Sequence, residues 1–544
     1  MFNARRLILA HFAVAFAIFA LGLLLGEWQM LVRSPLQAWV NNPEHYYRSV
    51  TAHGSALAYV FPTLIAMGFG YAITVTSLRQ ELIGARLAWI AFYMVVIGAV
   101  VAMAPVAAGR ASVLYTFYPP LIAHPLYYIG VVLVVVGSWI WVALLHVNER
   151  AWRRVHRNET LPLPMFANLA GAYLWAWTAV GAAAEILLQI LPVSLGWKTT
   201  IDAGLARVLF SWTLHAIVYF WLIPTYIAYY TIVPRAIGSR LYSETMARAS
   251  FALFLVFAMP IGIHHLFADP MVGSGIKMMH TIFTGMVAIP TLLTIFTITA
   301  TVELAARVRG GRGALGWIKA LPWSNPAMLA IAFSFVLLGL GGAGGLINMS
   351  YQLDSTVHNT QWITGHFHMI FAGAIVIMYF VIAYDLWPQL TGRELGSLSL
   401  IRTQLWLWFI GMMILTLPWH WAGLLGMPRR MAYFDYSSPD VAPEAWTVTL
   451  SAVGGLIVVI SGLLFVYILA SASRRPVTAA SQTAAYRFSE PLHAVAAMPK
   501  ALNGLGVWFL LMVALTLVNY GFPIYQLAQQ QDSNTPAIYV GGRQ

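Results

Sequence analysis

The sequence contains no cysteine and few charged residues. Among its 544 residues, Asp, Glu, Lys and Arg together make up only 9%. Without cysteine there can be no disulfide, iron–sulfur cluster or thiolate-bound copper or zinc, so any metal must be held by other ligands. The scarcity of charge, together with 60% hydrophobic residues and a mean hydropathy of +0.74, excludes a soluble globular protein, in which about a quarter of residues are charged. The composition is that of a membrane protein.

Long apolar runs recur along the whole chain. A membrane-spanning helix needs about 20 mostly apolar residues, and only helices or closed barrels satisfy their backbone hydrogen bonds in lipid. The runs are too long for barrel strands, so the sequence predicts an all-α polytopic membrane protein forming a single integral domain over residues 1–544. The thirteen expected spans are 7–32, 50–78, 85–107, 121–147, 166–193, 203–232, 247–268, 275–305, 323–349, 359–386, 402–426, 446–472 and 504–528.

Positive charge is distributed unevenly among the segments between these spans. Lys and Arg number 30, against 18 Asp and Glu. If the N-terminus is cytoplasmic, 21 of the 30 basic residues fall in inner segments, including a basic loop at about residues 473–503. Because cytoplasmic loops carry the excess of Lys and Arg, we expect the N-terminus inside and the C-terminus outside. The loops thus explain the basic composition without a nucleic-acid partner.

Two histidines in the tenth expected span are the first candidates for a functional site. Polar ligand groups inside a span are costly and point to function. His366 and His368 lie two positions apart. On a helix this is a rotation of about 200°, so the two rings point to opposite sides. They cannot bind one ion, and they suit two separate cofactors that flank one helix.

A second pair, His264 and His265, lies in the seventh expected span. Adjacent residues on a helix are about 100° apart, so both rings reach one metal only if the helix is distorted. Pro260 and Gly262, just before the pair, permit such a distortion. The pair is therefore a candidate for binding a single ion.

Two further histidines have suggestive neighbours. His215 and Tyr219 are four positions apart and share one face of the sixth span. His53 lies near the start of the second span beside Gly54, where a planar cofactor could approach the backbone closely. Both histidines extend the set of candidate ligands to six.

The expected topology places these six histidines in the outer half of the membrane. With a rise of 1.5 Å per residue, the sixth-span histidine lies about 18 Å from its outer end, the tenth-span pair about 11 to 14 Å and the seventh-span pair within about 8 Å. The second-span histidine is nominally shallower. Imidazole suits iron and copper, so the common depth indicates one metal-binding region. We interpret the isolated histidines as packing residues: His11, His124, His146, His280 and His420.

The motifs around these histidines resemble those of subunit I, the catalytic subunit, of the heme-copper oxidases. The resemblance extends over nearly the entire chain and is closest to the B-type, ba-type branch of cytochrome c oxidases. It is carried by the thirteen spans and by SWTLHAIVYFWLIPTY, IGIHHLFADP and VHNTQWITGHFH, at residues 211–226, 261–270 and 357–368. The HH and HFH motifs in these contexts are highly specific.

The resemblance implies two hemes. His53 and His368 would be the axial ligands of a low-spin heme, of heme b type, which carries electrons. His366 would bind the iron of a high-spin heme, of heme A type, where dioxygen docks. His366 and His368 point in opposite directions on their helix, which likewise assigns one of them to each heme.

The resemblance also implies a copper ion, CuB, held by His215, His264 and His265. Tyr219 resembles the tyrosine that in this family is covalently joined to a copper-ligating histidine. It would supply an electron and a proton when the O–O bond breaks. His215 and Tyr219 would therefore be the catalytic residues beside the metals.

The implied function is that of a terminal respiratory oxidase in the prokaryotic plasma membrane. Dioxygen would be reduced to water by four electrons, coupled to proton uptake and proton pumping. The usual electron-entry site contains two coppers with cysteine ligands and cannot lie on this cysteine-free chain. A second subunit, subunit II, is therefore implied, with cytochrome c as the electron donor.

Hydroxyl groups leading inward suggest how protons reach the buried site, because bare hydrocarbon does not conduct them. Tyr226 and Tyr230 follow Tyr219 on nearly one face of the sixth span, and three threonines recur at three-residue steps in the eighth. Such threonines often only bond back to their own helix. By the resemblance, however, these residues match the single proton input path of the B-type branch. The path would consist of Tyr226, Tyr230, Thr291, Thr294 and Thr297.

Charged residues on the outer side suit the heme propionates. Arg429 and Arg430 follow the eleventh span, and adjacent arginines bind carboxylates through charge-assisted hydrogen bonds. Asp354 and His358 precede the tenth span and belong to the same propionate region. They could also form part of a proton exit.

The sequence departs from the family at the copper tyrosine. The common motif is His-Pro-Glu-Val-Tyr, whereas residues 215–219 read His-Ala-Ile-Val-Tyr. The acid that ends a second proton path in A-type enzymes is therefore missing, which agrees with one input path and puts the pumping yield in doubt. The missing proline leaves the local helix bend open. Glu185, deep in the fifth span, has no assigned role, and burial would keep it protonated.

Two other functions are compatible with parts of the pattern. A nitric oxide reductase of the same superfamily would carry non-heme iron in place of copper, but such enzymes generally lack the crosslinked tyrosine, so Tyr219 argues against it. A transporter could use buried histidines as a proton relay and would bind no heme. Metal analysis and a reduced-minus-oxidised spectrum separate these functions.

Overall fold

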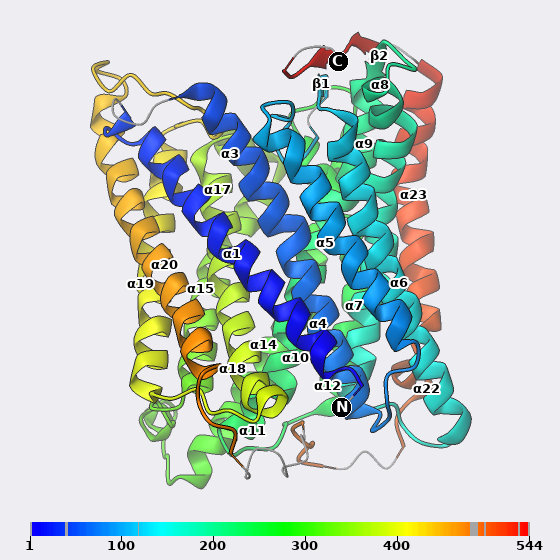
Figure 1. Cartoon of the computed structure of the whole chain (residues 1–544), viewed down its shortest axis with the longest axis vertical. Helices are drawn as coiled ribbons and strands as arrows, with labels where there is room; N and C mark the ends of the chain where they lie inside the picture. Colours follow the sequence, from blue (N-terminus) through cyan, green and yellow to red (C-terminus); the bar gives the residue numbers. More distant parts are fainter. Residues whose placement is uncertain are drawn as a thin grey trace.

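The computed structural model describes residues 3–37, 42–117, 119–478, 488–493, 497–530 and 534–541. Long helices run side by side in one bundle, with the two chain ends at opposite ends of it (Figure 1). In the described part, twelve helical stretches are long and apolar enough to cross a membrane. The predicted all-α polytopic fold is thus confirmed. Residues 479–487 and 494–496 of the loop expected at 473–503 lie outside the described residues.

The first half of the chain contains α1 (Arg5–Arg33), α3 (Pro43–Ser55), π-helix η1 (Ala56–Val60), α4 (Phe61–Ser77), α5 (Ala85–Ala107), α6 (Pro125–Val155), α7 (Leu163–Glu185), π-helix η2 (Ile186–Ile190), α8 (Leu191–Ser194), α9 (Ala203–Leu214), α10 (Ala216–Thr231), α11 (Val233–Ala236), α12 (Glu244–Phe257) and the 3-10 helix η3 (Gly262–Leu266). The second half contains α13 (Ser274–Met286), α14 (Ala288–Val308), the 3-10 helix η4 (Gly316–Ala320), α15 (Pro326–Met349), α16 (Tyr351–Val357), α17 (Gln361–His368), π-helix η5 (Met369–Ile375), α18 (Val376–Thr391), α19 (Leu398–Leu424), the 3-10 helix η6 (Ala442–Glu444), α20 (Ala445–Ala472), α22 (Lys500–Asn503) and α23 (Gly506–Gln530).

The seventh expected span, 247–268, differs from the prediction of a continuous helix. α12 ends at Phe257, and the chain continues through a turn into the short 3-10 helix η3. Pro260 lies in that turn, where its ring and missing N–H prevent an α-helix from continuing. The described chain therefore has twelve helical stretches long enough to cross a membrane and one broken span, where the sequence predicted thirteen spans.

Several helices begin where a polar side chain caps the first turn. Asp202 accepts a hydrogen bond from the backbone N–H of Leu205 at the start of α9 (2.9 Å), and Asn325 caps α15 through the N–H of Ala327 (2.8 Å). Ser, Thr, Asp and Asn stabilise a helix start in this way because the first N–H groups have no partner within the helix. Asn42 caps α3, so this helix begins well before residue 50, the predicted start of the second span.

Two small sheets close the end of the bundle that carries the C-terminus (Figure 1). Strand β4 (Ile538–Tyr539) pairs in parallel with β1 (Leu121–Ile122). Strand β3 (Asn534–Pro536) pairs antiparallel with β2 (Thr200–Asp202). The last described residues therefore lie across the loops that precede α6 and α9.

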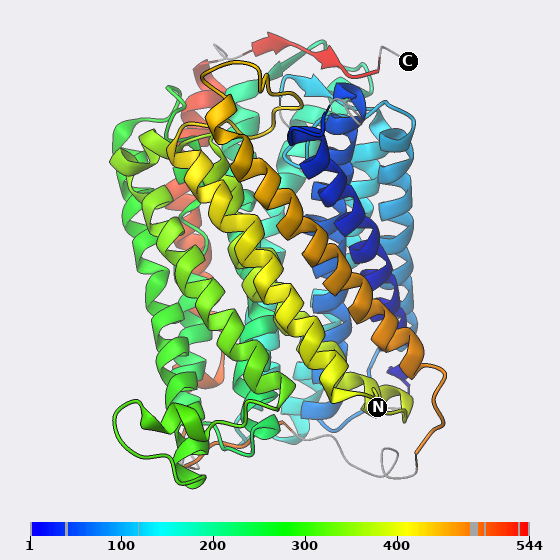
Figure 2. The ribbon, with the colours of Figure 1, turned by 90° about the vertical axis from the view of Figure 1, so that its left-hand side faces the viewer.

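The bundle is held together by close packing of helices. α19 and α20 run side by side along the bundle (Figure 2), and α5 packs on α6 so closely that a Cβ on Gly130 would lie 2.5 Å from the carbonyl oxygen of Gly98. Small residues permit such close approach in membrane bundles. Aromatic rings fill the space between α1, α18 and α20, with Phe380 and Phe465 centred 4.4 Å apart.

Candidate functional site

All six histidines predicted as ligands line one cavity of 740 Å³. Residues from eight or more separate helices contribute to it, among them α1, α3, α7, α10, α15, α17, α19 and α20. None of the five histidines interpreted as packing residues lines this cavity. The grouping that the sequence predicted from depth along the helices is therefore present in the fold.

His53 and His368 face each other across part of the cavity. Their ring centres lie 6.3 Å apart and their planes differ by 19°. His53 lies ten residues after the start of α3 at Pro43, or about 15 Å along the helix, so it reaches the depth of the other histidines. Gly26 of α1 lies against the ring, because a Cβ there would be 2.9 Å from Cε1 of His53.

The backbone orients three of the imidazoles. Nδ1 of His53 donates to the carbonyl oxygen of Gly22 (2.8 Å), and Nδ1 of His368 donates to that of Thr364 (2.9 Å). Nδ1 of His366 donates to the carbonyl oxygen of Gly341 on α15 (2.7 Å). A carbonyl can only accept, so each bond fixes the proton on Nδ1 and leaves Nε2 with a free lone pair. All three rings are thus oriented as metal ligands.

His215, His264 and His265 form a compact cluster, with one potential ligand atom from each lying within 4.8 Å of the others. Nδ1 of His215 is 3.0 Å from Nε2 of His265. Nδ1 of His264 is 3.1 Å from Oγ1 of Thr284 on α13, which fixes the orientation of this ring. The cluster contains three imidazoles and no carboxylate, a donor set that suits copper, zinc or iron.

Interrupted helices bring this cluster together. His264 and His265 lie in η3, where the 3-10 conformation places their ring centres 4.3 Å apart. His215 lies between α9 and α10 and ends the first of them. The helix is interrupted at His215 although Ala216 replaces the proline of the common family motif. The distortion expected near Pro260 and Gly262 is therefore present.

Tyr219 lies one turn beyond His215, with its hydroxyl 3.3 Å from Nε2 of that histidine. The same ring turns Nδ1 toward His265. His215 therefore presents one nitrogen to the cluster and the other to the phenol. The Tyr219 side chain is buried, 9% exposed, and lines the cavity.

Four of the five hydroxyls predicted for proton input are paired across α10 and α14. Tyr226 donates to Oγ1 of Thr291 (3.2 Å), and Tyr230 donates to Oγ1 of Thr294 (2.8 Å). Thr297 instead donates to the carbonyl oxygen of Leu293 in its own helix. The first four side chains therefore form cross-helix pairs, whereas the fifth makes the local bond that threonines commonly form.

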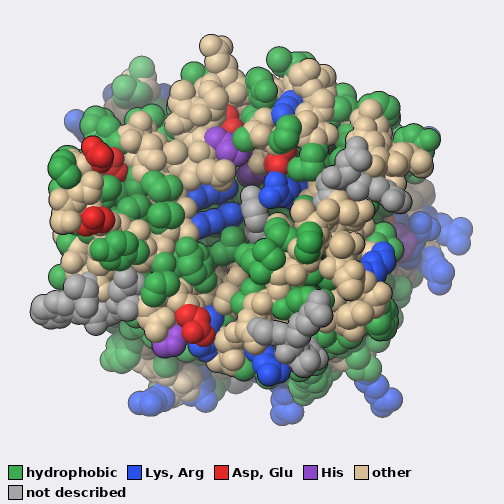
Figure 3. Space-filling model, turned by 90° about the horizontal axis from the view of Figure 1, so that it is seen from above, with side chains coloured by type: hydrophobic (Ala, Val, Ile, Leu, Met, Phe, Trp, Pro, Cys, Tyr) green, Lys and Arg blue, Asp and Glu red, His purple; other side chains and the backbone are tan. Residues whose placement is uncertain are grey.

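The predicted outer residues also line the cavity. His358 and Asp354 form a pair, with Nδ1 2.7 Å from Oδ2. Arg429 donates to Oδ1 of Asn359 (2.8 Å), and the backbone carbonyl of Arg430 accepts from the hydroxyl of Tyr47 (3.2 Å). Viewed from this end, basic side chains gather around a hollow in the surface (Figure 3). The hollow offers cations to an anionic group that enters the cavity.

Two glutamates lie in the same cavity, in addition to Asp269 and Asp354, which also line it. Glu185 is fully buried, and both of its carboxyl oxygens have no hydrogen-bond partner among the described residues. Glu27 of α1, which the sequence analysis did not single out, lines the cavity with one unpartnered oxygen. π-helices follow Glu185 and His368 directly and begin three residues after His53. Such bulges are often found at functional sites.

The sequence from residue 6 to residue 457 matches the family of cytochrome c and quinol oxidase polypeptide I. The chain belongs to this family.

Individual oxidase subunits are similar over most of the chain. Cytochrome c oxidase subunit 1 of Thermus thermophilus is 38% identical over 497 residues, which cover 89% of this chain and 87% of that protein. Cytochrome c oxidase subunit 1 of Thermostichus vulcanus is 27% identical over 436 residues, covering 76% and 73%. A solved structure of a heme-copper terminal oxidase dimer has a TM-score of 0.92 and 31% identity, and covers 99% of this chain and 96% of that one.

Membership of this oxidase family confirms the resemblance seen in the histidine motifs. The function of the chain is that of a terminal oxidase subunit I, an oxidoreductase that works with hemes and copper. It is a multi-pass membrane protein of the respiratory chain, and the family works with subunit II and cytochrome c.

Some polar partners of the oxidase site were missed by the sequence analysis. Thr284 holds His264 from another helix, and Ser250 bonds both Oγ1 of Thr294 (2.8 Å) and the carbonyl oxygen of Pro290 (2.7 Å). Thr284 and Ser250 each lie on a different helix from their partners, so the spacing of residues along one helix does not predict these contacts. Glu27, by contrast, is an acid within an expected span, and that signal was present in the sequence.

Proposed function

We propose that this chain reduces dioxygen to water between a copper ion held by His215, His264 and His265 and a high-spin heme held by His366. A low-spin heme between His53 and His368 feeds electrons to this centre. The observation that carries the proposal is one cavity lined both by a facing imidazole pair and by a compact cluster of three imidazoles.

The facing pair fits an iron between two imidazoles. Two nitrogen–metal bonds of about 2 Å each, the length known for imidazole on zinc, take up about 4 Å of the separation. The ring centres are 6.3 Å apart, so little more than 1 Å remains on each side, which is the distance from a ring centre to its nitrogen. The ring planes of His53 and His368 are also nearly parallel and both rings keep Nε2 free, so their geometry supports bis-histidine ligation.

The cluster fits copper through its donor set. Three imidazoles without a thiolate suit copper in either oxidation state, and Thr284 supplies the outer hydrogen bond typical of metal-ligating histidines. Copper and the high-spin heme, when bound, supply the dioxygen-binding site and electrons. The Tyr219 hydroxyl holds a proton 3.3 Å from Nε2 of His215. From this position the hydroxyl can give a proton. The covalent link known in the family would join the Tyr219 side chain to His215.

The finer assignments follow the B-type resemblance. The low-spin heme is of heme b type and the high-spin heme of heme A type, with Arg429, Arg430, Asp354 and His358 around the propionates. Protons enter through the pairs Tyr226–Thr291 and Tyr230–Thr294, and Thr297 extends this path inward. Phe254 packs against both Tyr219 and Tyr226, and water would complete the path between these two phenols.

The setting of the enzyme follows from charge and composition. The chain forms a single integral domain of the prokaryotic plasma membrane, with its N-terminus cytoplasmic and its C-terminus outside. Proton uptake from the cytoplasmic side builds a gradient, to which pumping adds. Because the chain has no cysteine, a two-copper entry site resides on subunit II, which receives electrons from cytochrome c.

Turnover of the purified enzyme with reduced cytochrome c tests this function. We expect four cytochrome c oxidised per dioxygen consumed, with water and not hydrogen peroxide as the product. Nitric oxide reduction faster than dioxygen reduction would instead identify a nitric oxide reductase.

A further inference from the structure

A second cavity lies at the end of the bundle that carries the N-terminus. It has a volume of 1140 Å³ and is bounded by α6, α7 and the junction of α22 with α23. In Figure 1, the end of α6 and α22 lie together near this end of the molecule. None of the six candidate metal ligands lines it, so it is distinct from the site described above.

The mouth of this cavity is strongly basic. Arg150, Arg153, Arg154 and Arg157 all line it, and their spacing places the helical members on one face of α6. Lys500 adds a fifth cation from the opposite wall. Among the described lining residues, Glu149 is the single carboxylate.

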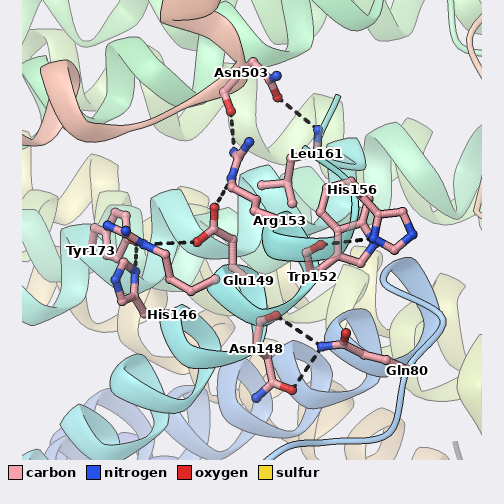
Figure 4. Close-up of polar contacts among 11 residues, drawn as sticks. Gln80, His146, Asn148, Glu149, Trp152, Arg153, His156, Leu161, Tyr173 and Asn503 are labelled. Atoms are coloured by element: carbon pink, nitrogen blue, oxygen red, sulfur yellow. Dashed lines mark hydrogen bonds and ion pairs between the residues drawn. The ribbon is translucent and has the colours of Figure 1, made fainter. Parts of the chain in front are cut away.

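The polar contacts at the mouth hold its walls together (Figure 4). Arg153 pairs with Glu149 in the preceding turn and donates to the carbonyl oxygen of Asn503 (2.6 Å). The amide oxygen of Asn503 in turn accepts from the N–H of Leu161 (2.9 Å). This network ties α22 to α6 and to the start of α7. It also balances the charge of Glu149 with Arg153, whereas Arg154 and Lys500 are exposed at the rim.

Most of the interior of the cavity is apolar, although His146 and Tyr173 also line it and form a pair, with Nδ1 of the histidine 2.6 Å from the tyrosine hydroxyl. Trp139, Val142 and Ala143 of α6 face Leu169 of α7 and Phe509 of α23 along its length. From Arg153 back to Trp139 the helix rises about 21 Å, which exceeds the roughly 15 Å of hydrocarbon in one leaflet. The cavity is therefore long enough along α6 to hold an acyl chain that begins at the basic mouth.

We propose that this cavity is a binding site for an anionic phospholipid. The phosphate lies among Arg154, Arg157 and Lys500, and an acyl chain follows the apolar wall past Ala143. Guanidinium groups bind phosphate oxygens through two charge-assisted hydrogen bonds, and basic pockets between spanning helices on the cytoplasmic side are known to take such headgroups. Both ends of the cavity match one molecule: a free phosphate would use only the mouth, and a neutral lipid only the apolar part.

Lipid titration of the delipidated holoenzyme, followed by native mass spectrometry, tests the site. We expect phosphatidylglycerol to bind with a measurable Kd and phosphatidylcholine to bind much more weakly. Each surface cation contributes about a factor of five, so Arg154→Gln combined with Lys500→Gln should weaken phosphatidylglycerol binding about 25-fold. The matched control is Arg312→Gln combined with Lys319→Gln, two exposed cations that do not line the cavity, and it should bind as the native enzyme does.

A second variant tests the apolar part and separates lipid from free phosphate. Ala143→Trp fills the groove without changing charge, and it should abolish phosphatidylglycerol binding while leaving the heme spectrum unchanged. The proposal is overturned if Ala143→Trp binds the lipid normally, if inorganic phosphate displaces the lipid at equal concentration, or if the control pair loses as much affinity as the mouth pair.

Discussion

The two histidine groups of the cavity are built on different backbones. His53 and His368 sit on long spanning helices, and backbone carbonyl oxygens orient their rings. The cluster of His215, His264 and His265 sits where helices are broken, and a side-chain hydroxyl, that of Thr284, orients one of its rings. A facing pair needs only two helices at the right separation, whereas three imidazoles around one ion need a local departure from helical geometry.

This difference predicts that the two centres can be lost independently. His368→Ala removes one of the two proposed ligands of the low-spin heme, so the low-spin heme band should disappear completely from the reduced-minus-oxidised spectrum while copper stays bound. His264→Ala should do the reverse, with copper lost and the low-spin band retained. Optical spectra combined with copper analysis of both variants check this. Loss of both centres in either variant would contradict separate ligand sets.

Tyr219→Phe should have the next largest effect. The phenol ring and its packing are kept, but the hydroxyl 3.3 Å from Nε2 of His215 is removed. Loss of a positioned proton donor slows turnover by about 100-fold or more. Dioxygen consumption is measured alongside heme and copper content, both of which should equal those of the native enzyme. Near-native turnover would show that Tyr219 only fills space.

Thr284→Val sharpens the comparison between the two centres. It removes the hydroxyl that orients His264, and loss of such an outer hydrogen bond lowers metal affinity by about 10- to 100-fold. Thr364→Val is the matched control, because Thr364 holds His368 through its backbone carbonyl, which the substitution keeps. In both variants, copper retention against a chelator reports on the copper site, and the low-spin spectrum reports on the low-spin heme. The contrast fails if both variants keep their copper equally well.

The smallest expected effect concerns proton supply. Thr294→Val removes the acceptor of the Tyr230 hydroxyl and should slow turnover about tenfold, since one buried hydrogen bond is worth about 1 kcal/mol or somewhat more. Thr297→Val removes only a bond back to its own helix and should change turnover less. If both variants slow turnover equally, Thr297 contributes to the proton path as much as Thr294 does. Flow-flash measurement of proton uptake separates this from slower electron transfer.

The spanning helices and the grouping of the six histidines could be predicted from the sequence. Apolar runs of the right length define the spans, and depth along a helix follows from residue number alone. The predicted start of the second span at residue 50 was too late, because Pro43–Ser49 includes polar residues in a helix that Asn42 caps. Pro260 indicated a distortion of the seventh span. It did not indicate that the helix would end there and leave twelve spanning helices in the described chain.

Other features of the site could not be predicted in this way. The π-helices after His53, Glu185 and His368 are variations in backbone hydrogen bonding that hydropathy does not report. Thr284 and Ser250 meet their partners across helices far apart in sequence, so only the packed fold brings them together. The roles of the individual site residues remain predictions for the variants described above.

Cofactor counting on the purified native chain tests the central claim most directly. Pyridine hemochrome analysis, metal analysis and carbon monoxide binding should give two hemes and one copper per chain, with carbon monoxide bound at one heme only. A colourless protein, or one with two hemes, no copper and a third iron, would contradict the assignment of the two histidine groups.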